Sequence, residues 1–390
     1  MRCAGGMRGV RGEGRGWLVR ALSLLLMLAS LQLGSLISPA YACGCGAMVP
    51  SRATQVSVDR ETSVVDWDGR TEQIVMRLTV RGDAPEAAWI MPVPHRATVE
   101  LGDPALFSEL ATLTAPVQAT RHYFWPRSDD WPFAGSGNSG DGVGAPSSAA
   151  PSVEVVGRER LGPFDVARLA ATDPEALQKW LQDNGFELPD RLATALKPYV
   201  DQKWEYVAIR LAPRDRNNPL GGDLDPLRLR FASDRLVYPM RLSKLASTPQ
   251  QLGLYVLAAH RMEPRDAIGG NAPQVTYAGR IDPRSARDGT GALEAVTGGK
   301  PVFVTAIEQS FPYPERIDGD HELRAAEADT PYRTMVYTDR LLTVGGVPVW
   351  VLSLLGAVLV AAAVVLLVLR VRRHRPVVPP PPVTVPPPLG

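Results

Sequence analysis

The sequence has few cysteines and histidines, and it lacks the short patterns that mark common enzyme families. Its 390 residues include 3 cysteines, which excludes a disulfide-dense secreted scaffold. The 5 histidines are scattered, and His321-Glu322 does not open a zinc-binding helix because Ala325 stands where a second histidine is required. No nucleophile elbow of the Gly-x-Ser-x-Gly type occurs. We therefore expect no metal, no cofactor and no recognisable catalytic residues, and the sequence favours a binding protein over an enzyme.

A strong charge of either sign is also absent. The formal net charge is +1, and no basic stripe is interleaved with aromatic residues. Nucleic acid is therefore not an expected partner. Proline and glycine are frequent instead, at 36 and 35 residues, which favours a protein of strands and turns over a helical bundle.

The C-terminal region contains a long apolar stretch, residues 347–369, without a charged side chain. It holds eight Val and seven Leu, and Pro348 is expected in its first turn. A helix of this length is about 35 Å long, enough to cross a hydrocarbon core of about 30 Å. Four arginines follow it and predict a cytoplasmic anchor by the positive-inside rule: Arg370, Arg372, Arg373 and Arg375. The stretch therefore predicts a single transmembrane helix, with the lipid bilayer as a partner.

Residues 1–42 are typical of a secretory signal peptide. A basic segment precedes an apolar run, and Ala40-Tyr41-Ala42 supplies the small residues that a signal peptidase reads. Cleavage there would leave Cys43 as the first mature residue, and an uncleaved signal anchor is the alternative. Both readings predict a cell-membrane protein with residues 43–343 extracytoplasmic and residues 370–390 as a basic, proline-rich cytoplasmic tail.

The exported region is expected to be a strand-rich α+β domain with a central helical pair. We divide it into a β-rich part at 43–133, a Gly/Ser/Pro-rich loop or linker at 134–152, and an α+β part at 153–343. Asp68-Gly69 is a strong hairpin signal between two alternating strands. Further along, Leu227, Leu229 and Phe231 alternate with Arg228 and Arg230, which predicts a strand with one buried and one wet face.

Three helices are expected in this region. The first covers 104–113, with Asp103 as its cap. The helical pair covers 174–183, ended by Asn184-Gly185, and 190–197, closed or kinked by Pro198. The pair interrupts an otherwise β-rich pattern, and no internal repeat accompanies it.

The order of several short motifs resembles an uncharacterised family of secreted or membrane-anchored bacterial proteins. The motifs are Cys43-Gly44-Cys45-Gly46 after the signal peptide, the Ala88–Pro94 run, Phe164-Asp165-Val166, the Leu177–Phe186 segment and Tyr238–Leu242. The resemblance covers most of the exported region and concerns a domain of unknown function. It implies architecture and location, and it implies no activity and no catalytic residues.

Cys43 and Cys45 are the residues with potential reactivity. Two cysteines separated by one residue can close a small, tight disulfide ring that pins the start of the chain. Alternatively, they form a thiol–disulfide redox pair, or Cys43 is acylated after cleavage. Two thiolates do not complete a tetrahedral metal site, so a metal is not favoured.

Aromatic residues gather just before the 134–152 segment. Tyr123, Phe124, Trp125 and Trp131 form a candidate exposed surface for a glycan or a protein, the alternative being that they cover the edge of the core. The tail residues 376–389 favour polyproline II, which would suit a cytoplasmic SH3-like partner or simply a solvated end.

These observations predict a membrane-anchored extracytoplasmic protein whose domain binds an envelope protein or polysaccharide. A redox protein using Cys43 and Cys45 and an unrecognised hydrolase are the alternatives.

Overall fold

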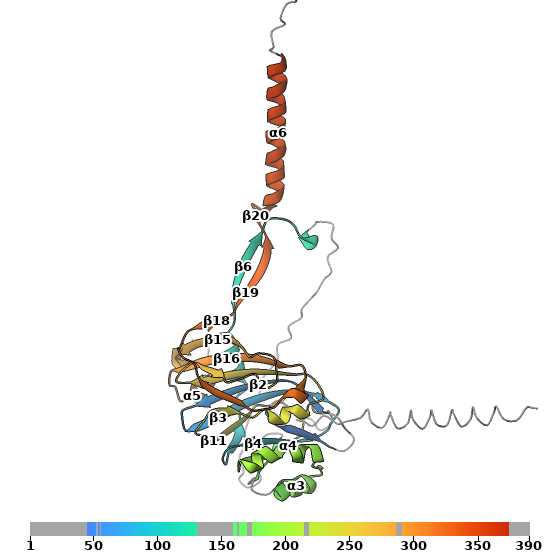
Figure 1. Ribbon diagram of the computed structural model, residues 1–390, viewed down its shortest axis with the longest axis vertical. Helices are drawn as coiled ribbons and strands as arrows, with labels where there is room; N and C mark the ends of the chain where they lie inside the picture. Colours follow the sequence, from blue (N-terminus) through green and yellow to red (C-terminus); the bar gives the residue numbers. More distant parts are fainter. Residues whose placement is uncertain are drawn as a thin grey trace, which may run out of the picture. The chain divides into compact units, whose positions relative to one another are not determined.

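The computed structural model describes residues 45–51, 54, 56–130, 159–161, 164–169, 174–213, 218–285 and 291–373. The described residues fall into two compact units (Figure 1). The first unit comprises residues 45–116 and 159–334, and the second comprises 117–130 and 335–373. Strands from residues 47–101 share sheets with strands from residues 159–281, so these two stretches of the chain build one unit together.

The first unit contains three β-sheets. Nine strands form the largest sheet: β2 (Val56–Trp67), β3 (Thr71–Gly82), β5 (Thr98–Leu101), β10 (Gly222–Asp223), β11 (Leu227–Ala232), β13 (Gln250–Ala258), β15 (Gln274–Ile281), β16 (Val302–Phe311) and β18 (Tyr332–Arg333). A five-stranded sheet contains β1 (Ala47–Pro50), β4 (Ala87–Val93), β9 (Glu205–Leu211), β8 (Phe164–Leu169) and β7 (Glu159–Leu161). The third sheet has three short strands: β12 (Val237–Tyr238), β17 (His321–Ala325) and β14 (Met262–Pro264).

Strands β2 and β3 form the antiparallel hairpin that Asp68-Gly69 predicts. One Asp68 carboxylate oxygen accepts hydrogen bonds from the backbone N–H groups of Arg70 and Thr71, at 2.9 and 2.7 Å. Gly69 has φ +94°, a conformation that favours glycine. On its other edge β2 pairs in parallel with β13, which lies almost two hundred residues later in the chain.

Alternation along the strands divides the core into three layers of side chains. Trp89 and Met91 of β4 face the large sheet, whereas Ala88 and Ile90 face helices α3 (Pro174–Asp183) and α4 (Asp190–Asp201). The far side of the nine-stranded sheet is covered by helices α2 (Ala105–Leu113) and α5 (Ala292–Thr297). The first unit is therefore a helix–sheet–sheet–helix sandwich, which confirms the strand-rich α+β class.

The expected helices are present, with one boundary corrected. Asp103 caps α2 by accepting a hydrogen bond from the Ala105 N–H at 2.8 Å. Helix α4 does not end before Pro198 as expected but continues to Asp201. Proline removes one helical hydrogen bond there, and Tyr199 beside it is fully buried with its hydroxyl donating to Asp320, which holds the last turn in place. Four single 3-10 turns, at Ser128–Asp130 (η1), Arg241–Leu245 (η2), Pro283–Ser285 (η3) and Pro314–Arg316 (η4), complete the described helical structure.

The second unit joins two distant parts of the chain. Strand β6 (Val117–Tyr123) pairs in parallel with β19 (Met335–Leu341). A hairpin of β20 (Thr343–Val344) and β21 (Val347–Pro348) follows, turning through Gly345 and Gly346 at φ +58° and +82°.

The C-terminal apolar stretch forms helix α6 (Val349–Arg373), which is long and apolar enough to span a membrane. Its mean hydropathy reaches 3.0, and none of its side chains is buried. Pro348 closes β21 directly before the helix, so the expectation that it occupies the first helical turn is wrong. Because proline lacks an N–H group, it fits the end of a two-residue strand, and the helix starts one residue later.

Candidate functional site

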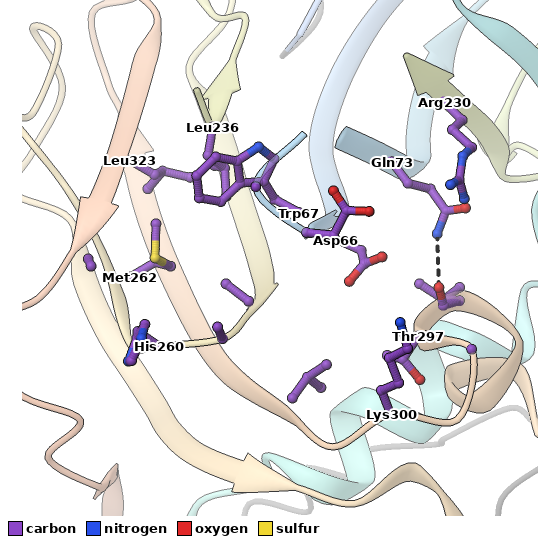
Figure 2. A pocket seen from close by; sticks show the side chains of 18 of the residues that line it. Asp66, Trp67, Gln73, Arg230, Leu236, His260, Met262, Thr297, Lys300 and Leu323 are labelled. Carbon is purple, nitrogen blue, oxygen red and sulfur yellow. Dashed lines mark hydrogen bonds between the residues drawn. The ribbon is translucent and has the colours of Figure 1, made fainter. Parts of the chain in front are cut away.

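A cleft with a volume of about 700 Å³ opens in the first unit, around the end of the β2–β3 hairpin. It is lined by this hairpin, by β11, by the residues after β13, by β17, and by the end of α5 with the Gly298–Val302 segment. Figure 2 shows Trp67, Leu236, Met262 and Leu323 on one side and Gln73, Arg230, Thr297 and Lys300 on the other, with Asp66 between them. The volume lies in the range of pockets that bind small molecules.

The polar side is built by strand register. Asp66 of β2 lies directly opposite Gln73 of β3, and Gln73 lies directly opposite Arg230 of β11. Side chains opposite one another on neighbouring antiparallel strands share a face, with Cβ atoms about 5 Å apart. Asp66, Gln73 and Arg230 therefore form a row across three strands, which we call the polar row.

Gln73 is tied to the helix that borders the cleft. Its side-chain amide donates to the backbone oxygen of Val296 in α5, at 3.4 Å. The residue is 2% exposed, and its side-chain oxygen has no hydrogen-bond partner among the described residues. A buried amide oxygen is costly to leave unpaired, so this atom is suited to accept a hydrogen bond from a bound group.

The charged groups of Asp66 and Arg230 in the polar row, and of Lys300 beside it, are available to contact a ligand. Burial, followed by the Asp68 carboxylate, raises the pKa of Asp66 to about 6, and Arg230 and Lys300 oppose this rise. Within the described contacts, the Asp66 carboxylate and the charged groups of Arg230 and Lys300 form no direct hydrogen bond or ion pair with the protein. The polar row and Lys300 thus offer acceptors and donors to a ligand, and Asp66 gains a proton in mildly acidic solution.

The opposite side of the cleft carries the apolar side chains of Trp67, Leu236, Met262 and Leu323. The Trp67 indole packs against the core between the two large sheets, and its N–H donates to the backbone oxygen of Ser233 at 3.3 Å. His260 lies beside this side, with its ring nitrogen 3.2 Å from the Asp329 carboxylate. A ligand with one apolar face and several hydrogen-bonding groups fits such a cleft.

A two-carboxylate hydrolytic site is not formed by the hairpin. Asp68 is the carboxylate nearest to Asp66 in the sequence, but its oxygen accepts both backbone bonds of the turn. These bonds lower the pKa of Asp68, whereas burial raises that of Asp66. Asp68 therefore stabilises the turn, and its negative charge helps to raise the pKa of Asp66.

The structure places Cys45 away from the cleft, in the core between the sheets. Its side chain is fully buried, with its sulfur 3.6 Å from the sulfur of Met76. Its backbone N–H donates to the Glu61 carboxylate at 2.9 Å. Cys43 lies outside the described residues, so the disulfide, the redox pair and the acylation remain predictions.

The aromatic and basic candidates lie in the second unit. Phe124 and Trp125 are exposed, and Tyr123 is half-buried. Arg370, Arg372 and Arg373 form the last turn of α6. Other predicted features fall outside the described residues: the signal peptide, Trp131, the loop or linker at 134–152, Arg375 and the proline-rich tail.

The sequence analysis missed the cleft. The hairpin signal at Asp68-Gly69 could have predicted one pair of the polar row, since a tight turn there sets Asp66 opposite Gln73. Arg230 was recognised only as part of a wet strand face. Its place beside Gln73 depends on the pairing of β3 with β11, which no local pattern specifies.

Comparison with known proteins gives one family match. A family model described as "Uncharacterized protein conserved in bacteria (DUF2330)" matches residues 39–324. No curated protein matches the chain. A solved structure, the crystal structure of baculovirus P35, aligns with 9% identity and a TM-score of 0.28, over 72% of this chain and 97% of that chain. A TM-score this low supports no conclusion about fold or function.

Proposed function

The chain belongs to the family of uncharacterised conserved bacterial proteins DUF2330, and from this premise we propose that it is a membrane-anchored glycan-binding protein of the bacterial envelope. In this proposal α6 spans the cytoplasmic membrane, the first unit lies outside, and the cleft binds a segment of an envelope polysaccharide. The supporting observation is a single cleft lined both by the polar row and by apolar side chains.

The membrane anchor is supported by length, composition and charge. Helix α6 has 25 residues and is therefore about 37 Å long, enough to cross the hydrocarbon core with some tilt. None of its side chains is buried, and those from Leu352 onward are exposed, which suits contact with lipid better than a place in a folded core. Arginines in its last turn favour a cytoplasmic C-terminal end.

A sugar fits the cleft better than a fully charged ligand. Asp66 has the opposite charge to Arg230 and Lys300, so no single charge on a ligand would be matched along the row. Hydroxyl groups can both donate to Asp66 and Gln73 and accept from Arg230 and Lys300. The apolar edge of a sugar ring would then lie against the Trp67 side.

Glycan titration of the full-length protein in detergent tests the proposal. Oligosaccharide fragments of envelope polysaccharides are titrated while tryptophan emission is followed. Arg230→Ala should weaken binding about tenfold, since one charge-assisted hydrogen bond contributes roughly 1.5 kcal/mol. Arg324→Ala is the matched control, because Arg324 also lines the cleft but is paired with Glu263 at 3.0 Å. Its effect should be less than about twofold.

The proposal fails if no oligosaccharide binds, or if Arg230→Ala and Arg324→Ala bind equally well. Binding of peptides in place of sugars would identify an envelope protein as the partner and would also overturn the glycan assignment. No observation on the described residues favours the redox or hydrolase alternatives.

A further inference from the structure

The aromatic segment that follows β6 is folded into a closed turn. The Tyr123 hydroxyl donates to the Asp130 carboxylate at 2.8 Å, and the same carboxylate accepts from the Arg127 N–H at 2.7 Å. The Arg127 guanidinium lies over the Tyr123 ring, 4.2 Å from its centre, and forms an ion pair with Asp339 of β19 at 2.9 Å. Residues 123–130 are therefore held in one conformation against the β6–β19 pair.

Within the same unit, this turn lies beside the start of α6. The Leu342 N–H donates to the backbone carbonyl oxygen of Tyr123, and the Val349 N–H donates to that of Leu342, both at 2.9 Å. Tyr123, Leu342 and Val349 are thus neighbouring backbone segments, separated by two strand spacings of about 4.8 Å each. Phe124 and Trp125 follow Tyr123 directly, so they lie close to the residue at which the apolar helix begins.

The two aromatic side chains are turned outward. Trp125 is 66% exposed and Phe124 is 37% exposed, and their rings meet edge to face with centres 5.1 Å apart. Beside them, Asp339 is paired with both Arg121 and Arg127, at 2.8 and 2.9 Å. This leaves an exposed aromatic pair on a hydrogen-bonded turn, close to the start of the apolar helix α6.

We propose that Phe124 and Trp125 insert into the lipid headgroup layer at the N-terminal end of α6. The inference rests on the proposed membrane anchorage of α6. Aromatic residues, tryptophan above all, favour this layer because their rings are apolar while the indole N–H can still be hydrogen-bonded. Trp350 is a third aromatic residue in the first turn of α6. Lipid is favoured over a soluble partner because the bilayer around α6 would already reach the N-terminal end of this helix.

The test uses the full-length protein in vesicles of phosphatidylcholine and phosphatidylglycerol. Lipids carrying a nitroxide either near the headgroup or near the chain end serve as quenchers of tryptophan emission. The share of the tryptophan emission that comes from Trp125 is the emission of the wild type minus that of Trp125→Phe. We expect the shallow nitroxide to quench this share about twofold more than the deep one. Trp180→Phe is the matched control, since Trp180 packs on the core of the first unit, and its share should not be quenched by either lipid.

Two outcomes overturn the inference. Quenching of the Trp125 share by aqueous acrylamide, and by neither lipid, would place the pair in water, available to a soluble glycan or protein. Protection from acrylamide and from both lipids would place it against protein, such as a second copy of the chain. Failure of the anchorage itself is distinguishable, because the whole protein would then be released from the vesicles by an alkaline carbonate wash.

Discussion

Glu61 and His321 are buried ionisable residues of the first unit with opposite responses to pH. Glu61 accepts hydrogen bonds from the Cys45 N–H and from the hydroxyl groups of Ser63 and Tyr238, yet burial raises the pKa of Glu61 to about 7. Burial lowers the pKa of His321 to about 4. Both residues are therefore favoured in their neutral forms, and each makes stability depend on pH over a different range.

Glu61→Gln should remove one part of this dependence. A carboxyl whose pKa is raised by folding stabilises the protein below its unfolded value of 4.5, and this contribution is lost as the pH rises to about 7. Glutamine has the shape of the neutral acid and cannot ionise. Above pH 7 the variant should exceed the wild type in free energy of unfolding by up to about 3 kcal/mol. Denaturant unfolding at several pH values, followed by tryptophan emission, measures the difference.

His321→Leu provides the opposite control. A histidine whose pKa is lowered stabilises the fold above pH 6.5, and this contribution is lost as the pH falls to about 4. The leucine variant should therefore lose less stability than the wild type in acid, while retaining the Glu61 response above pH 4.5. Identical pH profiles for Glu61→Gln and the wild type would show that Glu61 titrates normally in the folded state.

Among the turns between elements, two glycines with the same φ angle differ in their surroundings. Gly269 and Gly291 both have φ +81°. A Cβ atom at Gly269 would collide with the backbone oxygen of Arg316, whereas no described atom lies within 4 Å of a Cβ atom at Gly291. The loop after β14 therefore packs against the 3-10 turn η4 with backbone touching backbone, and only glycine permits this contact.

Gly269→Ala and Gly291→Ala form a matched pair of variants. Gly291→Ala should cost about 1 to 2 kcal/mol of stability, the cost of a left-handed conformation. Gly269→Ala adds a backbone clash and should cost about 3 to 5 kcal/mol in total. Thermal or denaturant unfolding of the two variants measures this difference. Equal losses would mean that the loop moves away from η4 without a penalty.

The local elements could be predicted from the sequence, but the way they assemble could not. The β2–β3 hairpin was predictable because Asp68 and Gly69 supply turn chemistry between alternating strands, and the alternation around Arg230 correctly gave a wet strand face. The parallel pairing of β2 with β13 joins residues nearly two hundred positions apart, and nothing within either strand specifies it. The candidate cleft depends on such long-range pairing, so its polar row emerges only in the folded chain.

At the scale of the whole molecule, the proposed topology is tested by protease added to intact cells. With α6 spanning the membrane and the first unit outside, protease should degrade residues 45–334 and leave a short C-terminal fragment, detected through a tag after Gly390. Protection of the full-length chain would contradict this orientation. Cells opened by detergent are the control, in which the C-terminal fragment should also be degraded.

The second unit is built from two separate stretches of the polypeptide, and this gives the first unit a double tether. The chain leaves the first unit after Pro116 to form β6, and it leaves again after Thr334 to form β19, which pairs with β6 over seven residues. If only the connection between Thr334 and β19 is cut, β6 is still hydrogen-bonded to β19, which is continuous with α6. A protease that cuts the chain once between Thr334 and Met335 would therefore not release the first unit, because release would also require β6 and β19 to separate.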